Sequence, residues 1–298
     1  MGVHATIPDF GDRLLQEVRR HAGRQSAIRK YYWLYFSEVA HQISLTHSKL
    51  IQALASRTFR FPFKNWCRIV DYQYSNQPLS ARGSILNDPG GRFNIGALDP
   101  YRFQPFPVLY LGQSFAIAYK EKFGQEHRTK VITRLRGISE DELALVSGKS
   151  FSEVSVESEI SEFLDINKLA SLSAITGILK RFRLSPALRA RARQLGLATP
   201  CWIASSKALQ KLLLAPNWRN LPQLVDIPAP SQVFGQIARS AGIEGILYRS
   251  KMSTAQENCL AIFPENFKYS PSFVAVHGEV PAATEHPVLD QHSWDKLI

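Results

Sequence analysis

Apolar positions in the first fifth of the chain recur with a helical period. A short stripe at Leu14, Leu15 and Val18 precedes a longer one whose members lie mostly three, four or seven residues apart: Ile28, Tyr32, Tyr35, Phe36, Val39, Ile43, Leu50 and Leu54. Such spacing places the side chains on one face of a helix. We predict a helical N-terminal annex over residues 1–62, whose aromatic face packs as core. A docking face for a partner chain is the alternative.

Beyond residue 62 the pattern changes to short apolar runs that are typical of strands. A first strand is expected over Phe63 to Tyr72 and a short one ends at Tyr110. Further strands are predicted at 131–137, 151–159 and 160–166, and the runs 245–250 and 258–263 form a β-hairpin. Loops rich in Ser, Asn, Pro and Gly separate these runs, notably at 75–91, and the segment 97–107 is a candidate flap.

Helical patterns are interleaved with the strands. Ser114 is placed to cap a helix that carries Glu121, residues 167–196 are helical, and Ser231 caps a helix that ends near Gly242. We therefore predict an α+β fold with one main domain over residues 63–270, interrupted by a helical insertion at about 167–230. Residues 271–298 lack periodicity and are expected to form a C-terminal extension.

Composition narrows the class of protein. The 298 residues are 45% apolar, which is enough for a sizeable core, and a net charge of +11 favours anionic partners. The cysteines, Cys67, Cys201 and Cys259, are too few and too scattered for a zinc site or a disulfide framework, so a reducing cytoplasm is expected. The N-terminus has no apolar signal region, and no run approaches the ~18 apolar residues of a membrane span.

Residues suited to chemistry concentrate between 67 and 125. Arg68 heads an apolar run, and Arg92 lies in a loop between Gly90, Gly91 and Gly96. The chain then passes Tyr110 and reaches Glu121 about two turns into a helix. Rival motifs are missing: Leu143 occupies the position of the first glycine that a P-loop ending in Gly148, Lys149 and Ser150 requires, and neither GxSxG nor HExxH occurs. We predict no metal site.

The order of these motifs resembles the RES domain family. The match consists of Arg68, the run GGRFN from Gly90, the run LYL before the helix of Glu121, and the run GILYRS that ends at Ser250 before LAIF. The family is named for an arginine, a glutamate and a serine, which here match Arg68, Glu121 and Ser250. The resemblance covers residues 66 to about 263, loosely over 134–230. Two departures are Ile69, where many members have an aromatic residue, and the lack of a histidine soon after Glu121.

The resemblance implies a toxin of a bacterial toxin–antitoxin pair, with an ADP-ribosyltransferase-like mixed β core and flanking helices, that degrades NAD. NAD is then the substrate, no cofactor is needed, inorganic phosphate is a candidate co-substrate, and a cognate antitoxin is the expected partner. Arg68 and Arg92 would hold the pyrophosphate while glycines 90, 91 and 96 let the backbone approach it. Glu121 would stabilise the cationic sugar, with Tyr110, Ser250 and Gln232 as further site residues.

For each of these residues, a structural role in the fold is the alternative to a role in catalysis or binding. Arg68 would then pair with a carboxylate at a strand end, Glu121 would lie on a solvated helix face, Ser250 in a turn and Tyr110 in the core. Glu126 and Glu244 are the next carboxylates to consider.

The acceptor in the reaction stays open among phosphate, water and a macromolecule that receives ADP-ribose. Arg82, Arg92 and Arg249 are the candidates for a second phosphate site. A non-enzymatic basic module that binds nucleic acid or an acidic partner is the alternative to an enzyme. The basic run from Lys180 to Arg193 is expected to be a solvated face first, with partner contact and nucleic acid as alternatives. Nucleic acid is not expected to be the main partner.

Overall fold

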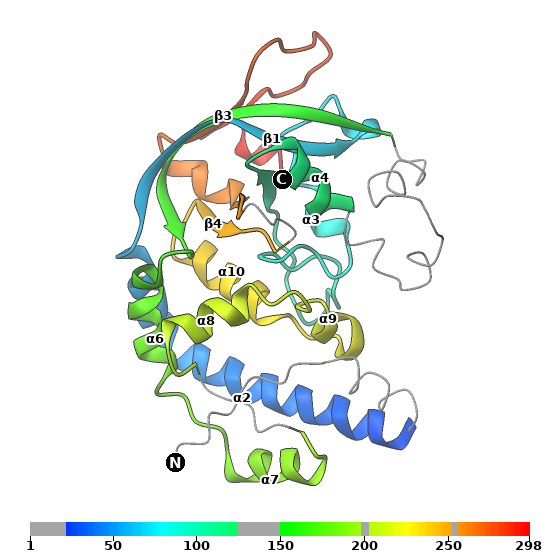
Figure 1. Ribbon diagram of the computed structural model, residues 1–298, viewed down its shortest axis with the longest axis vertical. Helices are drawn as coiled ribbons and strands as arrows, with labels where there is room; N and C mark the ends of the chain where they lie inside the picture. Colours follow the sequence, from blue (N-terminus) through cyan, green and yellow to red (C-terminus); the bar gives the residue numbers. More distant parts are fainter. Residues whose placement is uncertain (1–21, 124–149, 198–202, 252–255) are drawn as a thin grey trace. The chain divides into compact units, whose positions relative to one another are not determined.

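The computed structural model describes residues 22–123, 150–197, 203–251 and 256–298 (Figure 1). The chain divides into two compact units that alternate along the sequence. The helical unit comprises Met1–Arg57, Ile85–Phe106 and Lys168–Ala241, and the sheet unit comprises Thr58–Ser84, Pro107–Asn167 and Gly242–Ile298. The predicted α+β class is confirmed. These units are interleaved, whereas the sequence pattern suggested consecutive segments with boundaries near residues 62 and 270.

The helical unit is built around one long helix, α2 (Ala22–Ala55), which agrees with the predicted helical stripe over its described part. The other helices are η3 (Leu169–Leu172), α6 (Ser173–Leu179), α7 (Pro186–Gln194), α8 (Ser206–Leu213), α9 (Asn220–Val225) and α10 (Pro230–Ser240). Tyr31 and Tyr32 of α2 are fully buried in a core with Leu184, Leu188 and Val225. The aromatic face of α2 therefore serves as core, as expected.

The segment 97–107 has no regular structure, and its residues up to Phe106 belong to the helical unit. Phe103 stacks on Trp33 of α2 with ring centroids 6.0 Å apart, and the Arg102 guanidinium lies 4.7 Å from the centre of the same indole. Part of the candidate flap is thus packed against α2.

The sheet unit contains seven strands: β1 (Phe59–Asp71), β2 (Leu109–Gly112), β3 (Phe151–Asp165), β4 (Gly245–Arg249), β5 (Asn258–Ile262), β6 (Phe273–Val276) and β7 (Val288–Leu289). Their order is β1-β2-β5-β4-β3-β6-β7, and β1 also pairs with β3. The pairings therefore close a circuit of five strands. Its apolar residues, among them Phe63, Trp66, Leu109 and Leu260, form one core.

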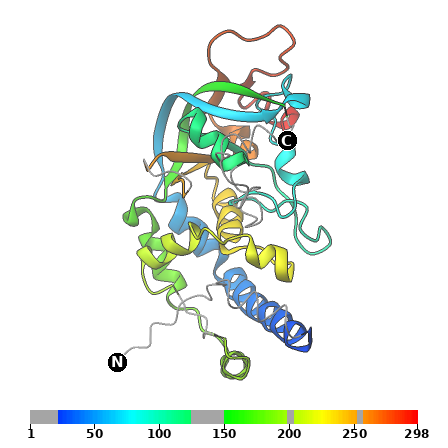
Figure 2. The same ribbon diagram turned by 45° about the vertical axis from the view of Figure 1, so that its right-hand side comes forward.

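The long antiparallel ladder of β1 and β3 carries this unit. It runs from the pair Phe59 and Phe163 to the pair Asp71 and Phe151, and Figures 1 and 2 show β1 and β3 as two long, curved strands beside each other. Register shifts near Phe59 and between Phe63 and Trp66 mark bulges, which bend strands. The predicted strand at Phe63 is confirmed with an earlier start, and the runs predicted separately at 151–159 and 160–166 form one strand.

The remaining elements of this unit are short. They comprise η1 (Tyr72–Tyr74), α4 (Phe115–Phe123), η4 (Pro264–Tyr269) and η5 (Trp294–Lys296), while α3 (Gly83–Leu86) lies at the point where the chain passes to the helical unit. Ser114 caps α4 as predicted, since the Ile117 N–H donates to its hydroxyl at 3.3 Å. The hairpin of β4 and β5 is also confirmed.

One sequence expectation is wrong. Ser231 does not cap α10 but is buried in its first turn, and the Ala229 N–H instead donates to the Gln232 side chain at 2.9 Å. Residues 271–298 supply β6 and β7 and bury Leu289 and Leu297, so they belong to the sheet and its core. The strand predicted at 131–137 lies outside the described residues. No helix in the described ranges combines the length and apolarity that a membrane crossing requires.

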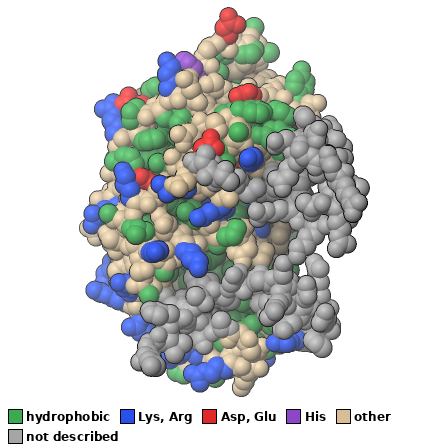
Figure 3. Space-filling view, in the orientation of Figure 1, with side chains coloured by type: hydrophobic (Ala, Val, Ile, Leu, Met, Phe, Trp, Pro, Cys, Tyr) green, Lys and Arg blue, Asp and Glu red, His purple; other side chains and the backbone are tan. Residues whose placement is uncertain are grey.

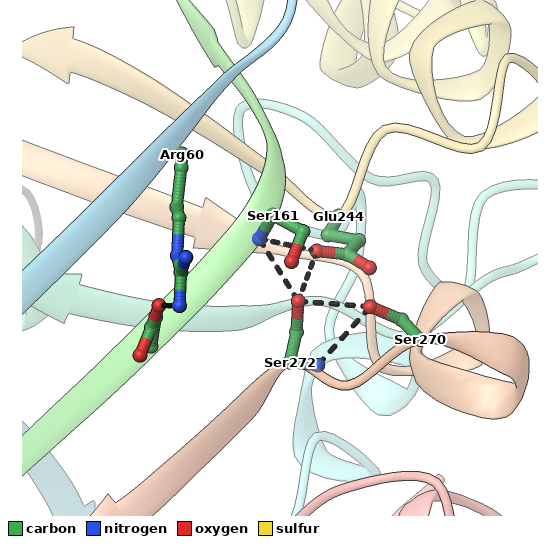
Figure 4. Close-up of polar contacts among 6 residues, drawn as sticks. Arg60, Ser161, Glu244, Ser270 and Ser272 are labelled. Atoms are coloured by element: carbon green, nitrogen blue, oxygen red, sulfur yellow. Dashed lines mark hydrogen bonds and ion pairs between the residues drawn. The ribbon is translucent and has the colours of Figure 1, made fainter.

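A buried carboxylate ties the C-terminal segment to the sheet. Glu244 is 1% exposed and accepts hydrogen bonds from the Ser161 N–H at 3.0 Å, the Glu162 N–H at 3.1 Å and the Ser272 hydroxyl at 2.6 Å (Figure 4). Ser270 contacts Ser272 in the same network. Glu244 is therefore engaged in holding β3, β4 and the segment before β6 together, which makes it a poor candidate for catalysis.

We predict that Glu244→Ala destabilises the fold by roughly 1–3 kcal/mol, because it removes the acceptor shared by these three donors. Thermal unfolding followed by circular dichroism measures the effect. Glu279→Ala is the matched control, since Glu279 is exposed in the same unit. Equal unfolding temperatures for the two variants would contradict the structural role given to Glu244.

Candidate functional site

The structure brings together two of the predicted site residues from distant parts of the chain. The Ser250 hydroxyl donates a hydrogen bond to Glu121 Oε1 at 2.5 Å, across 129 positions of sequence. Glu121 lies on α4, and Ser250 follows the last residue of β4. Ser250 is 4% exposed and its N–H donates to the Glu257 carbonyl oxygen at 2.9 Å. Glu121 is only half-buried, so a fixed carboxylate is left open to solvent.

Strand alternation places Tyr110 on the same side of the sheet as this pair. Leu109 and Leu111 of β2 point into the core, so Tyr110 and Gly112 point to the opposite face. Gly112 lies against α4, since a Cβ atom there would come within 2.6 Å of the Ala118 nitrogen. Tyr110 is half-buried and lies opposite Ala261. The α4 face of the sheet therefore carries Tyr110, Glu121 and Ser250.

Arg68 points to the other face. Cys67 and Ile69 pack with Ala118 and Phe123 of α4, so alternation along β1 directs Arg68 toward the core side, which Trp66 shares. The Arg68 Nη2 donates to the Ser80 carbonyl oxygen at 2.5 Å, while its Nε is inaccessible and has no hydrogen-bond partner. No contact joins Arg68 to Glu121 among the described residues.

Arg68 has no counter-ion among the described residues. No described carboxylate forms an ion pair with it, so the scaffold role of pairing at a strand end finds no support in the described part of the chain. Burial lowers the pKa of the Arg68 guanidinium from its ordinary value to about 9. The guanidinium is still charged at pH 7. A buried cation with an unused donor is suited to binding an anion.

The glycine-rich loop belongs to the helical unit and is packed on itself. Gly90 has a φ of +95°, which favours glycine, and a Cβ there would lie 2.4 Å from the Gly96 nitrogen. A Cβ on Gly96 would lie 2.1 Å from the Asn87 carbonyl oxygen. The Gly91 N–H donates to the Asn94 side chain at 2.8 Å. Within this unit the glycines are explained by the folding of the loop, without a ligand.

Gln232 holds this loop to α10. Its amide nitrogen donates to the carbonyl oxygens of Pro89 at 2.8 Å, Gly91 at 3.2 Å and Asn94 at 2.9 Å, and the residue is fully buried. Nearby, a Cβ on Gly235 would lie 2.0 Å from the Phe93 carbonyl oxygen. These contacts make Gln232 a positioning residue for the loop.

Arg92 is also engaged within the helical unit. It is 7% exposed, and its Nη1 donates to the carbonyl oxygens of Leu213 at 3.3 Å and Ala215 at 2.9 Å. These oxygens lie at the C-terminal end of α8, where a cation is favoured by the helix dipole. The guanidinium also lies 5.7 Å from the centre of the Trp218 ring. This placement argues against the phosphate-binding role predicted for Arg92.

Sequence reasoning missed a second carboxylate near the first pair. The Ser114 hydroxyl, at the start of α4, donates to Glu257 Oε1 at 2.5 Å. Glu257 lies directly before β5, opposite Ser250 in the hairpin. A glutamate at the tip of a predicted hairpin was the available signal, but only the fold shows that it meets the positive end of α4.

The other candidates raised from the sequence are distributed as follows. The Arg82 Nε donates to the Ile298 carbonyl oxygen at 2.8 Å, Arg249 is exposed, and Glu126 lies outside the described residues.

Cys67 is buried with Glu153 beside it, and burial raises the pKa of its thiol to about 12. Its thiol is therefore protonated at neutral pH and is no candidate nucleophile.

Comparison with protein families gives a match over part of the chain. Residues 174–281 match the RES domain. The resemblance noted in the sequence is confirmed. The RES match extends from α6 to beyond β6 and includes Gln232 and Ser250, while Arg68 and Glu121 precede it.

The chain was also compared with curated proteins and with solved structures. No curated protein matches the chain. Among solved structures, the M. tuberculosis MbcT–MbcA toxin–antitoxin complex aligns with 14% identity and a TM-score of 0.39, covering 84% of this chain and 96% of that one.

Replacement of Arg68 tests whether its charge serves the fold. We expect Arg68→Met to unfold at the parent's temperature or above it at pH 7, because a buried charge without a counter-ion costs stability. Since burial lowers the folded-state pKa to about 9, this cost is complete below pH 9 and declines as the pH rises above it. Any stability advantage of the variant should therefore be constant from pH 6 to 8 and smaller at pH 10.

Arg60→Met is the control on the same strand, because Arg60 is 71% exposed and forms a surface ion pair with Glu159. Its loss should cost at most about 1 kcal/mol. An Arg68→Met unfolding temperature several degrees below that of both the parent and Arg60→Met would show that Arg68 is structural.

Proposed function

We propose that the protein is a toxin of a toxin–antitoxin pair that cleaves the bond between nicotinamide and ribose in NAD. The RES match supports the class of protein. The observation that carries the proposal is the 2.5 Å hydrogen bond from Ser250 to Glu121, because it joins two residues that the family resemblance singles out. An ADP-ribosyltransferase-like core and a cognate antitoxin partner are parts of the same proposal.

The chemistry requires little from an acid or base. Nicotinamide leaves as a neutral molecule, taking the electron pair of the glycosidic bond, and the ribose acquires oxocarbenium character. A carboxylate held beside the sugar stabilises that charge without reorganising during the reaction. In our proposal Glu121 is this carboxylate, and the Ser250 hydroxyl fixes its orientation. Tyr110, on the same face of the sheet, lines the site.

Arg68 has the properties that the pyrophosphate requires. Its positive charge is unpaired among the described residues, and its Nε is an unused donor. We assign Arg68 to anion binding and do not assign Arg92, which is bound to α8.

The acceptor completes the reaction. Attack by water on the sugar gives ADP-ribose, whereas attack by inorganic phosphate gives ADP-ribose phosphate, and a proton is released to solvent in hydrolysis. The two are distinguished by following nicotinamide release from NAD by the pure protein with and without phosphate. A rate that depends on phosphate identifies phosphorolysis.

Glu121→Gln tests the central residue. Glutamine preserves an oxygen that can accept from Ser250 but removes the negative charge, so the turnover number should fall by about 10²–10³. NAD affinity should persist, because the anion is bound by Arg68, and Arg68→Met should weaken it. Nicotinamide release and equilibrium binding of NAD measure the two effects separately.

Two further variants make the test specific. Glu279→Gln has the same chemical change at an exposed position and should keep the parent rate. Ser250→Ala keeps the charge and loses the orienting hydrogen bond, so its loss should be smaller than that of Glu121→Gln. If folded Glu121→Gln released nicotinamide at the parent rate, the assignment of the carboxylate would be wrong.

A further inference from the structure

The positive charge of the protein is concentrated in one of its two units. By sequence, the helical unit contains 21 Lys and Arg against seven Asp and Glu, while the sheet unit contains 15 against 18. The helical unit therefore carries a net +14 and the sheet unit −3. Within the helical unit, residues 168–225 contain ten basic residues and no acidic one. The excess charge is thus a local property of this segment.

α7 is the most basic element of that segment, and its attachment to α2 is specific. Glu38 of α2 accepts from the Ser185 N–H at 2.8 Å and from the Ser185 hydroxyl at 2.6 Å, and Ser185 in turn caps α7. Leu188 and Ala192 are buried against α2. These contacts fix which face of α7 is outward.

The outward face consists of basic side chains. Arg189, Arg191 and Arg193 are exposed, as are Lys180, Arg181 and Arg183 just before the helix. None of the ion pairs formed among described residues involves any of these six. On the face in Figure 3, Lys and Arg side chains are spread over the described surface, and some of them lie at its lower end. Six adjacent cations without carboxylates repel one another, so this surface favours a polyanion.

The described residues from 180 to 197 expose no large apolar side chain, and this favours one class of anionic partner over an acidic protein or a membrane surface. Protein interfaces depend on buried aromatic or aliphatic anchors, and helices that lie on membranes insert an apolar face. The large hydrophobic side chains exposed on the described residues include none between 180 and 197. α7 thus offers charge and long arginine side chains but nothing apolar to bury. Binding to a phosphodiester backbone requires only the charge.

We propose that α7 and the basic residues before it bind the phosphate backbone of nucleic acid without regard to sequence. The site lies outside the residues assigned to NAD cleavage. Binding through backbone phosphates releases counter-ions, so it is sensitive to salt and carries no base preference. This activity would hold the protein on nucleic acid as a second property of the same chain.

The test uses the full-length protein and a fluorescently labelled DNA duplex, with binding followed by anisotropy between about 50 and 200 mM salt. The variant replaces Arg189, Arg191 and Arg193 by glutamine. The control replaces Arg60, Lys64 and Lys268, exposed residues of the sheet unit, and loses the same charge. The α7 variant should bind at least about tenfold more weakly, with a salt slope lower by roughly 2–3. The control should change the slope by less than about 1.

Nicotinamide release from NAD should be unchanged in the α7 variant, so the outcome is independent of the proposed function. Equal DNA binding by the α7 variant and the control would overturn the proposal. It would also be overturned if polyglutamate of equal charge competed as well as DNA, which would indicate an acidic protein partner. Binding to phosphatidylserine vesicles with no binding to DNA would overturn it in favour of a membrane surface.

Discussion

The antiparallel pairing of β1 with β3 is the constraint on which the sheet unit depends. It joins residues that lie 80 to 104 positions apart in the sequence, from one end of β1 to the other, and it closes the circuit that β2, β5 and β4 complete. Closure gives every strand an inner apolar face and an outer face. α4 covers part of the outer face, and this places Glu121 where the end of β4 presents Ser250. The same alternation turns Arg68 inward, beside the core.

The polar residues of the protein differ in how far groups of the protein itself satisfy them. Arg92 and Gln232 donate hydrogen bonds to backbone carbonyl oxygens, and Glu244 accepts hydrogen bonds from three groups. Those contacts explain the residues as parts of the fold. Among the described residues, Arg68 has a buried donor without an acceptor and a charge without a counter-ion, and Glu121 has a partly exposed carboxylate that Ser250 orients. Groups whose bonding capacity the fold leaves open are the ones to which we assign ligand binding and chemistry.

Sequence patterns located the elements that depend on neighbouring residues, and they did not locate those that depend on contacts between distant parts of the chain. The helical stripe of α2, the cap at Ser114 and the hairpin of β4 and β5 depend on neighbours in sequence, and the pattern of residues located them. β6 and β7 were missed because a short strand in a polar tail is stabilised by the sheet it joins. The same limit applies to Arg92, because an arginine can bind either a phosphate or the carbonyl oxygens at the C-terminal end of a helix. Its acceptor Leu213 at the end of α8 lies 121 positions away in the sequence, and no local pattern reveals that contact.

The central claim is that Glu121 and Ser250 belong to a site that consumes NAD. The most direct measurement is the NAD content of a bacterial host in which the chain is expressed without an antitoxin, beside a host that expresses Glu121→Gln at the same level. The account predicts that NAD falls and growth stops with the parent chain, while both are maintained with the variant. Unchanged NAD in cells that accumulate the folded parent chain would contradict it.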